Sequence, residues 1–437
     1  MSCKNHYYIR LSLWAAMYVQ LSSSFCVFAQ SGWEVLSVPT SEYLRSVQFI
    51  NSHTGYAVGT NGTIIKTTDG GNSWYNIPSN TNSTLHSVFF TDTLIGYIVG
   101  GLENSATILK TTDGGANWVS QVPPAARWFG AVHFLNPSIG YACGQGLTFI
   151  KTSDGGQTWL AQTSTLTWPN YSSLYFTGID TGYVVGNGRS IRKTTTGGFN
   201  WSSVSPSSDS IHDCISIYFT DAQTGFVAGR RFFDPHGFSF GVIMKTTNAG
   251  ESWYMSLDSV ITTFWDLHFP TDSIGYAVGE SCIERSIYKT TDAGVSWFRQ
   301  PYIAGTCYLN SVYFLNPDTG FAVGPVGIML RTTDGGGPPV SIQNTTGPAA
   351  LNFALNQNYP NPFNAATTIP FSIPTIAQVT LKVYNILGQE VATLVNEKLA
   401  AGNYAMSWEA TDFASGVYIY RIQAGDFVRS RKMLLLR

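Results

Sequence analysis

The chain has 437 residues, of which 14% are aromatic and only 11% are charged, and its formal net charge is −2. This length leaves room for two domains. This balance of charge lacks the excess of basic residues that is typical of proteins that bind nucleic acid. None of the six cysteines forms a Cys-x-x-Cys spacing and no histidine pair has ligand spacing, so we expect neither a metal site nor a cofactor.

Residues 1–29 have the pattern of a secretory signal peptide. Lys4 and Arg10 give a positive start, an apolar stretch follows, and Val27-Phe28-Ala29 resembles a small-residue cleavage site. The stretch is too short and too rich in serine to favour a permanent membrane span. We expect cleavage at this site, secretion, and no transmembrane segment in the mature chain. The alternative is a lipid anchor on Cys26, for which Ser-Ser-Phe-Cys is a poor signal.

A repeat fills residues 30–336. Each copy carries a Gly-aromatic pair, and successive pairs lie 41 to 50 residues apart. In the first copy, turn residues separate four short strands, at Arg45–Phe49, Gly55–Gly59, Thr63–Thr67 and Ser73–Ile77. A fixed period in this range is typical of propeller blades with four strands each. The glycines of the pairs are Gly55, Gly96, Gly140, Gly182, Gly225, Gly275 and Gly320.

The third and fourth strands of each copy are joined by the spacing Ser/Thr-x-Asp-x-Gly-x-x-Trp. Its aspartate is expected to accept N–H bonds of the turn, and its tryptophan to pack on the neighbouring blade. The aspartates are Asp69, Asp113, Asp154, Asp292 and Asp334, and the tryptophans are Trp74, Trp118, Trp159, Trp201, Trp253 and Trp297. Thr196 and Asn248 replace the aspartate in the fourth and fifth copies. The spacing resembles the Asp-box, or BNR repeat, of sialidases and other propellers. The whole repeat is most similar to the photosystem II assembly and stability factor family.

The inner-strand pattern occurs seven times, but the tryptophan occurs only six times because the last copy runs into Gly337-Pro338-Pro339. An unassigned Gly32-Trp33-Glu-Val-Leu36 precedes the first inner strand. We expect a seven-bladed propeller in which this N-terminal strand completes the last blade, so that no long sheet edge stays open. The alternative outer strand is Val340–Ile342, which the two preceding prolines disfavour.

Four cysteines remain after the expected cleavage. Cys143 takes the place of a strand valine and is expected to be a small buried hydrophobe. Cys214 lies just before an inner strand. Cys282 and Cys307 belong to adjacent repeats, and an oxidising compartment would permit a disulfide between them.

The period ends at a polar linker, residues 337–350, and residues 351–437 form a different all-β unit, expected to be a small immunoglobulin-like β-sandwich. Its strands are expected at Thr367–Ile373, Val379–Asn385, Asn403–Ala410, Gly416–Ile422 and Phe427–Leu436. Its motifs include Asn-Tyr-Pro-Asn-Pro-Phe-Asn from Asn358 and Gly-Val-Tyr-Ile-Tyr-Arg from Gly416. These motifs closely resemble the type A C-terminal sorting domain, which implies the type IX secretion machinery of Bacteroidota as a partner and release or display at the cell surface. The alternative is an ordinary binding module.

Catalytic patterns are weak in the repeat region. A glycosidase needs two carboxylates at one bond, and a sialidase needs an arginine cluster. The arginines do not occupy equivalent positions in the repeats, and most aspartates belong to the turns of the Asp-box spacing. Asp266 is the one acid in an inner-strand position that otherwise holds serine or alanine, and a hydrogen-bonded structural role is its simpler interpretation.

Irregular connections between repeats favour binding, because loops on a rigid scaffold carry function. The candidate binding residues, mostly aromatic or basic, are Arg127, Trp128, Trp168, Arg230, Arg231, Phe232, Phe233, His236, Phe238, Trp265 and Asp266. These connections should open on one face and suit an extracellular glycan, peptide or protein ligand. In the alternative, the rings only fill gaps between unequal blades. We expect a secreted or cell-surface binding propeller without catalytic residues. The other hypotheses are a sialidase-like or other glycoside hydrolase and a purely structural surface-layer protein.

Overall fold

The structure is a computed structural model. It describes residues 32–437 except 103, 125–126, 147, 163–169, 207–210, 233–238, 261, 281–286, 301–307, 338–352, 365, 400–401, 411–412 and 437. The described residues form β-strands and one 3₁₀ turn, Thr60–Gly62. None of their helices is long and apolar enough to cross a membrane. The expected signal peptide and the Cys282–Cys307 pair lie outside the described residues. Cys143 and Cys214 are buried free thiols.

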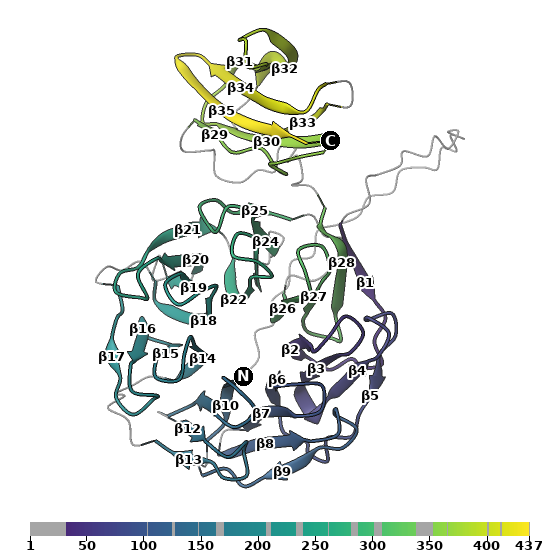
Figure 1. The fold of residues 1–437 in the computed structure, drawn as a ribbon, viewed down its shortest axis with the longest axis vertical. Helices are drawn as coiled ribbons and strands as arrows, with labels where there is room; N and C mark the ends of the chain where they lie inside the picture. Colours follow the sequence, from purple (N-terminus) through teal and green to yellow (C-terminus); the bar gives the residue numbers. More distant parts are fainter. Residues whose placement is uncertain are drawn as a thin grey trace, which may run out of the picture. The chain divides into compact units, whose positions relative to one another are not determined.

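Seven four-stranded antiparallel sheets are arranged around one axis as the blades of a propeller (Figure 1). The first blade contains β2 (Leu44–Phe49), β3 (Gly55–Gly59), β4 (Ile64–Thr67) and β5 (Tyr75–Asn76). The second contains β6 (Leu85–Phe90), β7 (Gly96–Leu102), β8 (Ser105–Thr111) and β9 (Val119–Gln121). The third contains β10 (Phe129–Phe134), β11 (Gly140–Gly144), β12 (Phe149–Thr152) and β13 (Leu160–Ala161). The fourth contains β14 (Tyr171–Phe176), β15 (Gly182–Gly186), β16 (Ser190–Thr194) and β17 (Ser202–Ser203).

The remaining three blades follow the same order from the axis outward. The fifth contains β18 (Asp213–Phe219), β19 (Gly225–Phe232), β20 (Ser239–Thr246) and β21 (Tyr254–Val260). The sixth contains β22 (Thr263–His268), β23 (Gly275–Glu280), β24 (Ile287–Thr290) and β25 (Phe298–Arg299). The seventh contains β26 (Ser311–Phe314), β27 (Gly320–Val323), β28 (Met329–Gly336) and, as its outer strand, β1 (Gly32–Leu36).

The N-terminal strand closes the ring, as the sequence predicted. β1 is antiparallel to β28, with Glu34 opposite Arg331. Trp33 is only 2% exposed, and its ring meets Phe314 edge-on at 5.8 Å. On the inner side, the Asn310 side chain of the last blade donates to the Leu44 carbonyl of the first at 2.7 Å. Closure therefore joins the two ends of the repeat region at both the inner and the outer strands.

Each box ties its blade to the preceding one. In the third blade, the Gly155 carbonyl accepts hydrogen bonds from the Tyr97 hydroxyl and the Lys110 ammonium of the second blade, both at 2.6 Å. The Lys110 ammonium also lies 5.7 Å from the centre of the Tyr97 ring. The box tryptophan Trp159 meets Tyr97 and its own Phe134 edge-on. The repeated lysine and Gly-aromatic pair of the sequence therefore hold adjacent sheets together.

The box carboxylates should make part of the stability depend on acid. Asp113 accepts hydrogen bonds from the backbone and side chain of Asn117 and from Thr111, and these bonds lower the pKa of Asp113 to about 2. A carboxyl whose pKa is lower in the folded than in the unfolded state stabilises the fold at pH values above its ordinary pKa near 4. This contribution is lost as the pH falls through 2.

We therefore expect Asp113→Asn to lose less stability than the wild type between pH 4 and pH 2 in thermal melts. The natural Asn248 shows that an amide fits this turn, since its Oδ1 accepts from the Ser252 N–H at 3.0 Å. Equal acid sensitivity of variant and wild type would contradict the assignment.

The C-terminal unit consists of two antiparallel sheets that share one hydrophobic core, with Trp408, Tyr420 and Leu381 buried in it. One sheet has the order β29 (Ala354–Leu355), β30 (Ala366–Ile373), β33 (Gly402–Glu409). The other has the order β32 (Glu390–Leu399), β31 (Ala377–Tyr384), β34 (Gly416–Ala424), β35 (Phe427–Leu435). The sequence prediction missed β29 and β32. Both lie at sheet edges, where β32 tolerates the charged residues that obscure its alternation.

Candidate binding face at the mouth of the propeller channel

A bulge in the inner strands determines which side chains line the central channel. In the first blade, Leu44 pairs with Gly59 and Ser46 with Val58, so Arg45 is the extra residue. Leu44 is buried in the blade, whereas Arg45 and Ser46 are both partly exposed, as is Gln48 two residues later. The same register shift occurs in the inner strands of the next five blades. The channel wall therefore has three layers, which we call the mouth, middle and lower layers.

The middle layer links neighbouring blades. Its residues are Ser46, Ser87, Ala131, Ser173, Ser216, Asp266 and Ser311. The Ser46 hydroxyl accepts a hydrogen bond from the N–H of Val88 in the next blade, and Ser311 accepts one from Val47 across the closure. These serines explain why small polar residues recur at this phase of the sequence.

Asp266 replaces serine in this layer and is held by four hydrogen bonds from the protein. Its Oδ1 accepts from the Ser216 hydroxyl and the Leu267 N–H, and its Oδ2 accepts from the Ser311 hydroxyl and the Val312 N–H, at 2.8–3.1 Å. Burial raises the pKa of Asp266 to about 6, against the effect of these bonds. All the lone pairs of the carboxylate are directed to donors of the protein, which favours a structural role.

The lower layer is a belt of rings. It contains Gln48, Phe89, His133, Tyr175, Tyr218, His268 and Tyr313. From Phe89 to Tyr313, the centres of adjacent rings lie 4.7–5.4 Å apart. Burial lowers the pKa of His133 and of His268 to about 4, so both imidazoles are neutral at neutral pH. This end of the channel is therefore aromatic and uncharged.

The mouth layer has mixed composition, and its residues are Arg45, His86, Gly130, Ser172, Ile215, Trp265 and Asn310. The Trp265 ring stacks on Tyr308 at 5.8 Å, and the His86 ring lies 5.1 Å from Trp128. Burial, together with the charge of Arg45, lowers the pKa of His86 to about 4. Trp128 and Trp265 were among the candidates predicted from the sequence, whereas Arg45, His86 and Tyr308 were not. Arg45 and His86 lie directly before the middle layer, and this position was the signal that could have found them.

Two side-chain donors at the mouth lack an acceptor among the described residues. Arg45 Nε and Trp265 Nε1 are shielded from solvent and have no hydrogen-bond partner within the described part of the chain. A buried donor without an acceptor costs free energy. A ligand that offers carbonyl or carboxylate oxygens to the mouth would remove this cost.

The rim beside the fifth blade is preorganised. Arg230 donates to Asp213 at 2.8 Å, and its guanidinium lies 4.8 Å from the centre of the Phe232 ring. Arg231 forms an ion pair with Asp258 at 2.9 Å. Phe232 is 42% exposed, so its ring offers apolar surface at this rim.

The other sequence candidates have different outcomes. Arg127 is exposed and its side chain lies against Gly146. Phe129 and Phe264, the sequence neighbours of Trp128 and Trp265, are fully buried, because each is the inner-strand residue just before the bulge and points into its blade. Phe233, His236, Phe238 and Trp168 lie outside the described residues.

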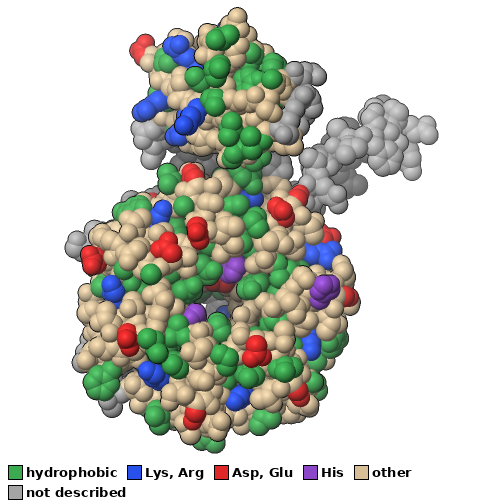
Figure 2. All heavy atoms as spheres, viewed as in Figure 1, with side chains coloured by type: hydrophobic (Ala, Val, Ile, Leu, Met, Phe, Trp, Pro, Cys, Tyr) green, Lys and Arg blue, Asp and Glu red, His purple; other side chains and the backbone are tan. Residues whose placement is uncertain are grey.

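The strand register places these segments at one end of the propeller. Asp213 pairs with Arg230 and Thr263 pairs with Glu280, so the start of an inner strand lies beside the end of the second strand. The boxes follow the third strands and lie at the opposite end. Figure 2 shows an opening at the centre of the ring.

Comparisons with known proteins agree with the repeat. The family model "Photosynthesis system II assembly factor YCF48" matches residues 26–124 and 121–263, which together exceed half of the chain. The chain belongs to this family. The model "Secretion system C-terminal sorting domain" matches residues 357–435, so the C-terminal unit is a sorting domain and marks the chain for export to the cell surface or the medium. No curated protein matches the chain by sequence.

Solved structures support the fold. A structure of YCF48 bound to D1 peptide is 21% identical, covers 70% of this chain and 98% of its own, and has a TM-score of 0.56. YCF48 from Cyanidioschyzon merolae is 20% identical over 69% of this chain and 98% of its own, with a TM-score of 0.54. A GH74 enzyme from Niastella koreensis is 15% identical over 91% of this chain and 74% of its own, with a TM-score of 0.55. At these identities, the likeness extends to the fold alone.

Proposed function

We propose that this member of the YCF48 family is an exported binding propeller whose mouth face binds an extended polypeptide segment of an extracellular partner. In the proposed organisation, residues 1–29 are a cleaved signal peptide, 30–336 the binding propeller, 337–350 a linker and 351–437 the sorting domain. The sorting-domain match supports export. The rings and unsatisfied donors of the mouth support binding.

The pair of shielded donors carries the proposal. Arg45 Nε and Trp265 Nε1 lack an acceptor among the described residues, and a polypeptide supplies carbonyl acceptors along its whole length. Trp128 and Phe232 add partly exposed aromatic surface, the kind of residue that dominates interface energies. A related propeller of the family was solved with a bound peptide. These observations favour a polypeptide over a glycan.

The test uses two mouth residues and one control. A full-length chain with Trp128→Ala and Phe232→Ala should bind peptides selected from an extracellular peptide array at least about tenfold more weakly, because loss of a hot-spot ring costs about 2 kcal/mol or more. Phe199 is 64% exposed in a box at the opposite end, so Phe199→Ala should bind like the wild type. A lower Tm of the double variant, or equal weakening by Phe199→Ala, would contradict a binding role for the mouth rings.

A glycoside hydrolase is the second candidate, favoured by the likeness to GH74 enzymes in fold. Asp266 is the acid at the channel wall, yet its four hydrogen bonds leave no oxygen lone pair for a substrate. Incubation with xyloglucan and with a sialylated glycan distinguishes the two functions. Release of reducing ends or sialic acid that disappears in Asp266→Ser would identify a hydrolase and overturn the binding proposal.

A further inference from the structure

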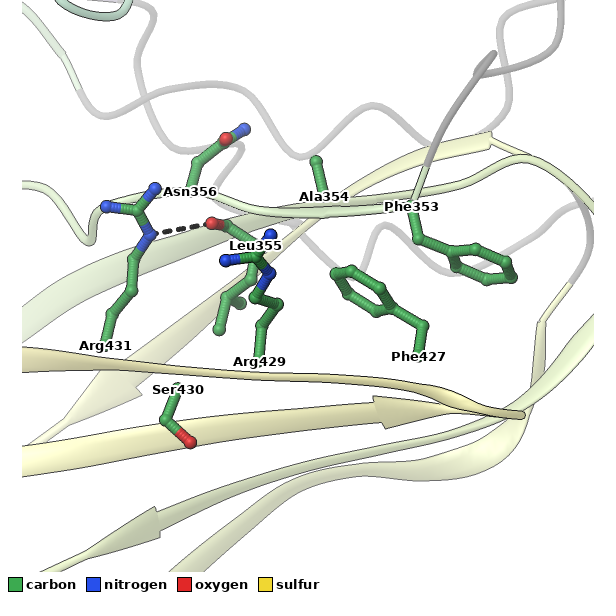
Figure 3. A pocket seen from close by; sticks show the side chains of 8 residues that line it. All are labelled: Phe353, Ala354, Leu355, Asn356, Phe427, Arg429, Ser430 and Arg431. Carbon is green, nitrogen blue, oxygen red and sulfur yellow. Dashed lines mark hydrogen bonds between the residues drawn. The ribbon is translucent and has the colours of Figure 1, made fainter.

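A pocket of about 460 Å³ lies in the C-terminal unit, between the edge strands of its two sheets. Residues of β29 and its neighbours, Phe353–Asn356, form one side, and Phe427 and Arg429–Arg431 of β35 form the other (Figure 3). The pocket thus opens where neither sheet has a further strand.

Two arginines give the pocket its charge. Arg429 and Arg431 are two residues apart on β35 and extend toward β29, whereas Ser430 between them points the other way (Figure 3). Arg431 Nε donates to the Leu355 carbonyl at 2.7 Å. The Arg429 side chain is exposed and forms no hydrogen bond or ion pair with the residues that the structure describes. Among the residues that the structure describes, no carboxylate lines the pocket, so none of them neutralises its positive charge.

The charge of the whole unit agrees with that of the pocket. Residues 351–437 hold seven basic and five acidic residues, whereas the rest of the chain holds 17 basic and 21 acidic residues. Figure 2 shows Lys and Arg side chains gathered on this unit. An anionic ligand is therefore attracted to the C-terminal unit and not to the chain in general.

The free edge of β35 adds backbone groups beside the arginines. The outward-facing backbone of Leu434 bonds to Phe363 and Asn361, and the Lys432 carbonyl accepts from Gln357. The backbone groups of Val428 and Ser430 point outward from this edge, as those of Lys432 and Leu434 do. No backbone partner faces Val428 and Ser430 within the described residues. An unpaired edge of this kind is a template for an added strand.

An apolar wall adjoins the charged part of the pocket. Phe353 and Phe427 stack at 5.3 Å with an interplanar angle of 16°. The pocket therefore offers two guanidinium groups, an aromatic surface and strand-type backbone groups within one short length of β35. A free phosphate would use only the first of these, while a peptide with an acidic side chain would use all three.

We propose that this pocket binds an acidic, extended peptide segment of a partner protein. The segment pairs with the edge of β35 at Val428 and Ser430 and places a carboxylate on Arg429 and Arg431. Charge-assisted bonds from guanidinium to carboxylate are short and directional. The ligand of this site is independent of the ligand of the propeller mouth.

Fluorescence anisotropy on the full-length chain tests the site. The probe is a short labelled peptide of alternating threonine and valine with one central glutamate, and the comparison peptide carries glutamine there. The glutamate peptide is expected to bind at least about tenfold more tightly, because a hydrogen bond to a charged group contributes more than a neutral one. Arg429→Gln should abolish this preference. Lys432 lies three residues further along the strand, on its opposite face. Lys432→Gln removes the same charge and should retain the preference for the glutamate peptide.

Two further measurements address the backbone and the anion. A glutamate peptide methylated on alternate backbone nitrogens should lose binding, since it cannot pair with β35. Inorganic phosphate should displace the peptide only weakly. The proposal would be overturned if the two peptides bound equally, or if Arg429→Gln and Lys432→Gln had equal effects. It would also be overturned if the methylated peptide bound fully, or if phosphate alone displaced the peptide at the concentration of the peptide.

Discussion

Replacing Trp33 with alanine is expected to lower the free energy of unfolding of the propeller by about 3–5 kcal/mol, the usual cost of deleting a large aromatic side chain from a core. Trp33 is buried among Tyr276, Leu309 and Phe314 and supplies the ring that the truncated last box lacks. Its loss leaves a cavity between the last two blades at the point of closure. Urea unfolding followed by tryptophan fluorescence and circular dichroism measures the change.

Val35 provides the matched control. It is the neighbour of Trp33 on β1 but is 56% exposed, so Val35→Ala should change the stability by no more than about 0.5 kcal/mol. If the two variants were equally stable, β1 would not be part of the last blade.

The second large effect concerns Asp266. Because the folded-state pKa of Asp266 is about 6 against an ordinary value of 3.8, its carboxyl stabilises the fold when protonated. This contribution is fully present below about pH 4 and is lost as the pH rises through 6, at a cost of up to about 3 kcal/mol. Asp266→Ser restores the residue type of most other blades and removes the titrating group. The wild type should therefore lose stability relative to Asp266→Ser between pH 4 and pH 7.

Comparing Asp266→Ala with Asp266→Ser isolates the contribution of the hydrogen bonds at this position, because neither variant carries the charge. Alanine leaves the N–H groups of Leu267 and Val312 without their side-chain acceptor, at a cost of about 1–3 kcal/mol for each group left unpaired. This variant should be less stable than Asp266→Ser at every pH in chemical denaturation. A stability difference between wild type and Asp266→Ser that stays constant from pH 4 to pH 7, or that changes in the opposite direction, would contradict the burial of this carboxyl.

The repeat made most of the propeller predictable. The spacing of the Gly-aromatic pairs identified seven blades, and the missing seventh box tryptophan pointed to Trp33, because a closed ring needs an equivalent side chain in each blade. Local rules were sufficient here because every blade repeats the same contacts. Lys110 and Tyr97, for example, meet the next box in the same way as their counterparts in other blades.

The mouth was less predictable, because its composition depends on the bulge. Strict alternation would point only one of Arg45 and Ser46 into the channel, and the sequence gives no separate signal for the extra residue. The same bulge turns Phe129 and Phe264 into their blades while Trp265 stays at the mouth. The pocket of the C-terminal unit was not foreseen for a different reason, since it forms between β29 and β35, which are far apart in sequence and belong to different sheets.

The mouth exists only if the ring is closed, and hydrogen exchange of the β1 amides tests closure most directly. Amides of a strand that are hydrogen-bonded to its neighbour in a closed sheet exchange only through opening of the sheet, whereas those of a frayed terminus exchange freely. Closure predicts that the β28-bonded amides of β1 are protected to the same degree as amides of β27 in the same blade. Exchange of these β1 amides at the rate of an unstructured peptide, with β27 still protected, would contradict it.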